Sequence, residues 1–127
     1  MGGLIVGLFV ERGNELFFEV CLCERRHEVR GLSGQIVIQG IFPTTVEKIL
    51  DIEGHTKIVR ETLEPIPKTV TVIVYVTGCQ PLLQAFYVWL NNALHHSILP
   101  RIILAHYDRN REDYRYYCAN YGNEIYL

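Results

Sequence analysis

Apolar runs separated by short polar breaks dominate the start of the chain. Residues 3–10 and 15–23 are two such runs on either side of Arg12-Gly13-Asn14, and residues 35–39 form a third. Because Gly and Asn adopt the positive φ of tight turns, the first two runs predict a β-hairpin. We therefore expect residues 1–40 to form an N-terminal β-meander.

The pattern becomes helical in residues 41–66. Thr44 and Glu47 have the spacing of a capping box, which predicts the first turn of a helix there. Gly54 predicts a break in this helix, with residues 56–63 as a second helical piece. The triplet Pro65-Ile66-Pro67 predicts the end of the segment, because proline does not continue a helix.

Residues 68–110 have the most apolar pattern. Val70–Val76 is a run of mainly β-branched residues, which is typical of a central strand covered on both faces. From Pro81 to His95 the side chains are apolar around most of a helical circumference, and proline suits a first helical turn. Ile102–Ala105 predicts the next strand. The order strand, helix, strand predicts a right-handed parallel βαβ unit.

Residues 111–127 predict closing strands, with a hairpin around residues 120–123. We therefore expect one α/β domain over residues 1–127, with a small Rossmann-like βαβ core in 68–110. The β-meander (1–40) and the helical segment (41–66) precede this core. One flank of the apolar helix 81–95 would meet the sheet, and we expect the other to meet a second copy of the chain in a homodimer.

Composition narrows the classes of partner. The chain has 127 residues, of which 49% are apolar and 20% charged, and its formal net charge of −2 argues against a duplex-DNA binder. Its apolar windows are too short for a membrane span, and its start lacks the basic residues of a signal peptide. We expect no membrane partner and a cytoplasmic protein whose four cysteines are reduced.

Cys21 and Cys23 leave two alternatives open. A zinc site is one, but the single residue between them is a shorter gap than usual and no second pair follows. Alternate positions of a strand point to the same side. The pattern therefore favours two thiols buried on one face of the core.

Chemistry-bearing residues follow both strands of the predicted βαβ unit. Ligands of open α/β sheets bind beyond the carboxyl ends of the strands, against helix N-termini. Thr77-Gly78-Cys79-Gln80 follows the first strand. Close backbone approach at Gly78, with the donors of Thr77 and Gln80, suits a phosphate at a positive helix end. Cys79 lies in the same ligand-binding loop, but we expect no chemistry from its thiol.

His106-Tyr107-Asp108-Arg109 follows the second strand and is the more reactive group. Imidazole, phenol, carboxylate and guanidinium together suit acid–base catalysis or a metal ion. Arg109 and Arg111 would add bidentate partners for phosphate oxygens. His95-His96 is a further candidate.

Each of these groups has a structural alternative. Thr77-Gly78 is also an ordinary helix entry, and His95-His96 also suits the C-terminal cap of a helix. Asp108-Arg109 equally fits a turn with an ion pair. The tail is rich in tyrosine, which would stack on nucleobases or, as the pattern favours, form an edge strand or dimer contact. These residues are Tyr114, Tyr116, Tyr117, Tyr121 and Tyr126.

The stretch VYVTGCQPLLQAFYVWLNNALHH, followed by RIILAHYDR, resembles a family. It is similar to small CRISPR-associated Rossmann-like proteins related to the cyclic-oligoadenylate-sensing domain, which include ring nucleases of type III CRISPR systems. The resemblance covers about residues 70–110. It implies a homodimer that binds a cyclic oligoadenylate, with Thr77, Gly78 and Gln80 facing the ligand. His96, Asp108 and Arg109 would lie nearby.

The resemblance also implies a reaction. A 2′-hydroxyl would attack phosphorus and leave a cyclic phosphate, while the enzyme positions groups and neutralises charge. His106 or His96 would transfer the proton, and Arg109 would stabilise the developing charge. No cofactor is predicted, and manganese is the metal to test.

Two other hypotheses remain open at this point. The chain would be a non-catalytic dimeric interaction or regulatory protein that uses helix 81–95 and the tyrosine-rich tail. Alternatively, it would be a metal-dependent phosphoesterase that uses the histidines with Asp108.

Overall fold

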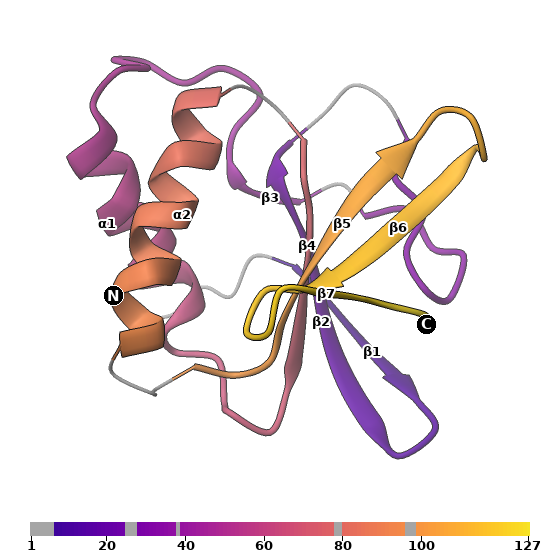
Figure 1. Ribbon diagram of the computed structural model, residues 1–127. Helices are drawn as coiled ribbons and strands as arrows, with labels where there is room; N and C mark the ends of the chain where they lie inside the picture. Colours follow the sequence, from indigo (N-terminus) through magenta and orange to yellow (C-terminus); the bar gives the residue numbers. More distant parts are fainter. Residues whose placement is uncertain (1–6, 25–27, 38, 78–79, 96–98) are drawn as a thin grey trace.

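A computed structural model describes residues 7–24, 28–37, 39–77, 80–95 and 99–127. These residues form a mixed sheet with the strand order β1-β2-β4-β5-β6-β7, and β3 pairs with β2 (Figure 1). The protein is thus α/β, as predicted. The elements are β1 Leu8–Arg12, β2 Glu15–Cys23, β3 Gly40–Phe42, α1 Ile52–Leu63, β4 Thr71–Tyr75, α2 Gln80–His95, β5 Ile102–Asp108, β6 Asp113–Cys118 and β7 Asn123–Ile125.

The middle of the sheet is parallel. β2 pairs with β4, and β4 pairs with β5, in parallel, whereas β1–β2, β5–β6 and β6–β7 are antiparallel. Every residue of β4 is buried, as expected of a β-branched strand that is covered on both faces. Because β2, β4 and β5 run in one direction, their carboxyl ends meet at one edge of the sheet. We call this the carboxyl edge.

Both helices lie against the same face of the sheet (Figure 1). The core on this side joins Phe18 and Val74 of the strands to Val59 of α1 and Phe86 of α2. α1 therefore covers part of the apolar surface of α2 for which the sequence had predicted a second copy of the chain. Within the described residues, no helix is long and apolar enough to cross a membrane.

The opposite face of the sheet is covered by residues 28–37, which we call the covering loop. Val29 and Val37 of this loop pack on Ile73 and Ile103 in a second core cluster. The loop has no helical residues. Apolar side chains at its two ends pack it against the sheet.

The N-terminal strands differ from the predicted meander. β1 and β2 form the predicted hairpin, with Gly13 at a φ of 63° in its turn. In the described part of the third predicted strand, 35–39, Ile36 forms an isolated bridge with Arg30, and the carbonyl of Gln39 accepts a hydrogen bond of 3.0 Å from the amide of Cys21. The strand next to β2 is β3, and it is parallel to β2, whereas a meander has antiparallel neighbours. The reason is that Val37 covers the sheet face and does not extend the sheet.

The first helix begins later than the capping-box pattern predicts. Lys48 has a φ of 48°, which a right-handed helix starting at Thr44 does not tolerate. Asp51 is the N-cap, and its Oδ1 accepts a hydrogen bond of 3.1 Å from the amide of Gly54. Gly54 therefore lies in the first turn and does not break the helix. A Cβ at this position would clash with the capping carboxylate.

Cys21 and Cys23 are both buried, as predicted, but they do not share a face. Cys21 belongs to the cluster under the covering loop, where its thiol donates a hydrogen bond of 3.5 Å to the carbonyl of Val37. Cys23 packs in the helix-side cluster with Phe42. Cys23 is the last residue of β2, and its strand partner is Phe42 of β3.

Candidate functional site

The ends of β4 and β5 lie side by side at the carboxyl edge. Tyr75 pairs with Ala105, and the amide of Val76 donates a hydrogen bond of 2.9 Å to the carbonyl of Ala105. The chain then enters α2 at Gln80, while β5 continues to Asp108. The two predicted groups of site residues therefore follow neighbouring strands at one edge. Gly78 and Cys79 lie outside the described residues.

Thr77 has a structural role at this edge. Its side chain is buried, and its Oγ1 donates a hydrogen bond of 2.7 Å to the carbonyl of Cys23. The same oxygen accepts one of 3.0 Å from the amide of Cys23. These two bonds tie the ends of β4 and β2 together. The Thr77 hydroxyl is thus engaged by the backbone, whereas Gln80 is exposed in the first turn of α2.

β5 is longer than the predicted strand, which changes how the second group is arranged. His106, Tyr107 and Asp108 are paired with β6, with Arg115 opposite His106 and Tyr114 opposite Tyr107. Side chains alternate along a strand, so His106 and Asp108 point to the helix side of the sheet and Tyr107 to the other side. The predicted loop tetrad is therefore divided between two faces.

A shallow cavity of 480 Å³ lies at the β5–β6 hairpin, and we call it the hairpin site. Three predicted catalytic residues, His106, Asp108 and Arg109, line it together. Arg115 and Tyr117 also line it, and neither was predicted as a site residue. The signal that would have found Arg115 is the register of the hairpin, which sets it opposite His106.

His106 is the candidate base of the hairpin site. Its ring is partly buried and packs edge-on against Tyr117, with the ring centroids 5.7 Å apart. Burial lowers the pKa of His106 below its ordinary value of 6.5, because it removes water from the charged form. The imidazole is therefore mainly neutral at pH 7 and able to accept a proton.

Charged side chains surround His106. Oδ1 of Asp108 accepts a hydrogen bond of 3.0 Å from the amide of Asn110, and Oδ2 lies 3.9 Å from Nη1 of Arg115. Arg115 makes a bidentate pair with Glu124 of β7, at 2.9 Å and 3.0 Å, and this pair raises the pKa of its guanidinium. Arg109 is exposed and forms no ion pair with the described residues. Its charge is therefore open to a ligand.

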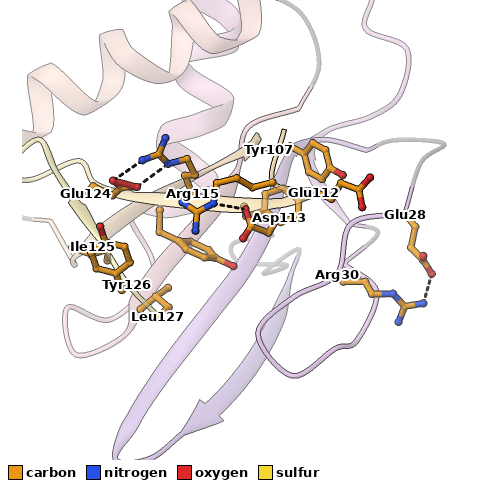
Figure 2. A pocket seen from close by; sticks show the side chains of 13 residues that line it. Glu28, Arg30, Tyr107, Glu112, Asp113, Arg115, Glu124, Ile125, Tyr126 and Leu127 are labelled. Atoms are coloured by element: carbon orange, nitrogen blue, oxygen red, sulfur yellow. Dashed lines mark hydrogen bonds and ion pairs between the residues drawn. The ribbon is translucent and has the colours of Figure 1, made fainter. Parts of the chain in front are cut away.

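A second cavity, of 570 Å³, lies against the same hairpin, and we call it the tyrosine pocket (Figure 2). Its walls come from Glu28 and Arg30, from the β5–β6 hairpin and from residues 124–127. Arg111, which we predicted as a ligand-binding residue, lines this pocket and not the hairpin site. Tyr107 lines both cavities, as does Arg115.

Aromatic side chains connect the tyrosine pocket to the buried sheet. Tyr75 lies edge-on to Tyr114, with centroids 5.0 Å apart, and Tyr114 lies edge-on to Tyr107 at 5.3 Å. The Tyr75 hydroxyl donates to the fully buried carboxylate of Glu19. Burial, reinforced by this hydrogen bond, raises the pKa of Tyr75 far above its ordinary range.

His95 is not part of the hairpin site. α2 has 16 residues, so about 22 Å of helix separates Gln80 from His95 at a rise of about 1.5 Å per residue. His96 lies outside the described residues. In the described ranges, no three His, Cys, Asp or Glu side chains gather as a metal-binding group.

Comparisons with protein-family models, curated proteins and solved structures find no match to this chain. The fold and the two cavities at the β5–β6 hairpin are therefore the basis for a functional proposal.

Proposed function

We propose that this protein binds a cyclic oligoadenylate at the carboxyl edge and cleaves it in the hairpin site. The observation that carries the proposal is the meeting of His106, Asp108 and Arg109 in one cavity at the end of β5. β5 is the parallel neighbour of β4, after which the chain enters α2 at Gln80. A neutral base and a free cation thus lie at an edge where α/β proteins bind ligands.

The charges at this edge suit a phosphodiester. A phosphodiester offers two non-bridging oxygens, which a guanidinium binds as a fork, and Arg109 has no competing ion pair in the described residues. The N-terminus of α2, a helix of 16 residues, adds about half a positive charge. Because the whole chain has a net charge of −2, the attraction is local, and binding should weaken as salt is added.

The side chains of the hairpin site supply the groups that cleavage needs. A ribose 2′-hydroxyl attacks the adjacent phosphorus, and its proton passes to the neutral ring of His106. The bond from phosphorus to the 5′-oxygen breaks, and that oxygen takes a proton from water. The products carry a 2′,3′-cyclic phosphate and a 5′-hydroxyl. Arg109 neutralises charge on the phosphoryl oxygens, and Asp108 holds the turn that carries Arg109 through its bond to Asn110.

Incubation of the protein with cyclic tetra-adenylate and cyclic hexa-adenylate, with and without Mn²⁺, tests this proposal. We expect at least one ring to bind and to give a linear product with a cyclic phosphate, identified by mass spectrometry. Failure of both rings to bind and to be cleaved would overturn it.

Three variants refine the test. Arg109→Ala should weaken ring binding, whereas His106→Ala should retain binding and lose cleavage. Arg101→Ala is the matched control, because Arg101 is exposed and precedes the first residue of β5, at the opposite end of the strand from Arg109. This control should behave like the wild type.

A dimeric interaction protein is the second candidate function. It is favoured by Tyr87 and Val88, whose side chains are 38% and 43% exposed on α2. Trp89 is only 2% exposed and belongs to the core, so it is unsuitable for probing an interface. Val88→Glu should convert a dimer to a monomer in sedimentation. A wild type that sediments as a monomer would exclude this candidate.

A further inference from the structure

The tyrosine pocket and the hairpin site share two of the residues that line them. Tyr107 lines both cavities, and so does Arg115. The two cavities therefore meet at the β5–β6 hairpin, and a ligand that carries both phosphates and planar bases offers a group to each. The volume of 570 Å³ also lies in the range of small-molecule sites, which is roughly 300–1,000 Å³.

Arg30 presents a planar cation at the wall of this pocket. Its Nη2 donates a hydrogen bond of 2.7 Å to Oε1 of Glu28, and its Nη1 donates one of 2.9 Å to the carbonyl of Gly34. The side chain is nevertheless 60% exposed. Figure 2 shows the Arg30–Glu28 pair on the covering loop, apart from the hairpin that carries Tyr107. A guanidinium held in this way offers a face on which an aromatic ring stacks.

One buried side chain fixes both walls of the pocket. Oε1 of Glu19 accepts a hydrogen bond of 2.9 Å from the amide of Leu32, which anchors the covering loop. The same oxygen accepts a hydrogen bond of 2.6 Å from the hydroxyl of Tyr75. The ring of Tyr75 packs against Tyr114, which lies in the opposite wall. The pocket is therefore organised before any ligand enters, which reduces the entropy lost on binding.

Glu112 supplies a hydrogen-bond acceptor to the tyrosine pocket. It lies at the turn of the β5–β6 hairpin with a φ of 55°, a left-handed conformation that is uncommon outside glycine. Its carboxylate lines the tyrosine pocket and forms no hydrogen bond or ion pair with the described residues. Carboxylates accept hydrogen bonds from the exocyclic amino groups of nucleobases.

We infer that the tyrosine pocket is the base subsite of the ligand. It takes one adenine, stacked on the guanidinium of Arg30 and with its exocyclic amino group on Glu112. The inference rests on the proposed function, because it adds base recognition to the phosphate site of the hairpin. Arg30 and Glu112 thereby become the residues that select adenine.

Two rings with the same backbone test this assignment. The wild type should bind cyclic tetra-adenylate roughly tenfold more tightly than cyclic tetra-uridylate, since purines stack more strongly. Arg30→Ala should lose this preference by weakening only the adenylate ring. Arg30→Lys should do the same, because an ammonium keeps the charge but has no planar face. Arg101→Ala is again the control, and thermal melting checks that each variant is folded.

Glu112→Gln tests the amino-group contact separately. Inosine has a carbonyl in place of the amino group of adenosine, so the wild type should disfavour cyclic tetra-inosinate. Glu112→Gln should reduce this discrimination several-fold, since an amide donates to a carbonyl. Unchanged discrimination would overturn the role of Glu112.

The outcomes separate the two proposals. If the wild type binds adenylate and uridylate rings equally, or if Arg30→Ala weakens both equally, the base subsite is overturned while the phosphate site stands. If the wild type binds neither of these rings nor cyclic hexa-adenylate, the proposed function fails and the base subsite fails with it.

Discussion

The hydroxyl of Tyr75 donates a hydrogen bond of 2.6 Å to Oε1 of Glu19 in the interior of the sheet. Glu19 lies on β2 and Tyr75 on the adjacent parallel strand β4, and neither side chain is exposed to solvent. The same oxygen accepts a hydrogen bond from the amide of Leu32, whereas Oε2 of Glu19 has no hydrogen-bond partner among the described residues. A single carboxylate thus links two central strands to the loop that covers them.

Tyr75→Phe should therefore destabilise the fold. It removes one of the two donors that the described residues offer to the buried Glu19 carboxylate, and it adds nothing in its place. Loss of a partner by a buried polar group costs about 1–3 kcal/mol of unfolding free energy, which urea denaturation would measure. Tyr121→Phe is the control, because Tyr121 is 85% exposed and should tolerate the change. Equal stability of Tyr75→Phe and the wild type would contradict a structural role for this bond.

Gly31→Ala should also lower the stability, for a steric reason. A Cβ at Gly31 would lie 2.5 Å from Oε2 of Glu19, whose side chain is fully buried and has no room to move aside. Overpacking of this kind costs about 1–3 kcal/mol in the free energy of unfolding. Ser33→Ala, an exposed change in the same loop, should be nearly neutral.

A double-mutant cycle would show whether the clash is the cause. In the background Glu19→Ala, the carboxylate that meets the new methyl group is absent, so Gly31→Ala should cost much less. Strictly additive losses for the two changes would argue against a direct contact between these positions.

His106 should titrate with a pKa below its ordinary value in the folded protein. Because burial lowers the pKa of His106 below 6.5 in the folded state, the unfolded state binds the proton at a higher pH. The contribution to stability is therefore complete above pH 6.5 and is lost as the pH falls from 6.5 through the folded pKa. Tyr117→Ala should move the pKa back toward 6.5 by exposing the ring.

Proton NMR of the His106 ring would measure this titration directly. Cleavage of a bound ring should lose rate over the same acidic range, because protonated His106 no longer acts as a base. A midpoint at or above 6.5 would contradict the assignment of His106 as a desolvated, neutral imidazole.

Glu124→Gln should strengthen the binding of an anion in the hairpin site. Glu124 engages Arg115 through a bidentate pair, and Arg115 lines that cavity. Removal of the carboxylate charge frees the guanidinium for a phosphate and removes a repulsive charge, so ring affinity should rise several-fold, most clearly at low salt. Glu61→Gln, a surface change on α1, is the control. Weaker binding would mean that Glu124 is needed to hold Arg115 in position.

The central elements agree closely with the sequence pattern. The run Val70–Val76 predicts β4 at Thr71–Tyr75, and the run Pro81–His95 predicts α2 at Gln80–His95. Both predictions depend on hydrophobic periodicity over adjacent residues, which packing in this fold does not override. The closing hairpin of β6 and β7 also falls within the predicted residues 111–127.

The misplaced elements have weaker local signals that tertiary contacts override. The capping-box pattern of Thr44 and Glu47 does not start a helix, because the chain has a positive φ at Lys48 and is capped by Asp51. Residues 35–39 look like a strand, yet Val37 is used to cover the sheet. In each case an alternative that satisfies the whole core replaces the local preference.

The candidate site was likewise predicted in part by the local sequence and decided in part by tertiary contacts. Its residue types and its place after two apolar strands were readable along the chain, since they depend only on order and spacing. The sequence did not predict the hydrogen bonds between Thr77 and Cys23, which lies 54 residues earlier. It also did not predict that Arg115 lies opposite His106. Local periodicity was sufficient for the α/β class and for the place of the candidate residues at the ends of neighbouring strands. Strand register and packing were needed for the partner of each side chain, because hydrogen bonds and ion pairs join residues that meet only when the sheet has assembled.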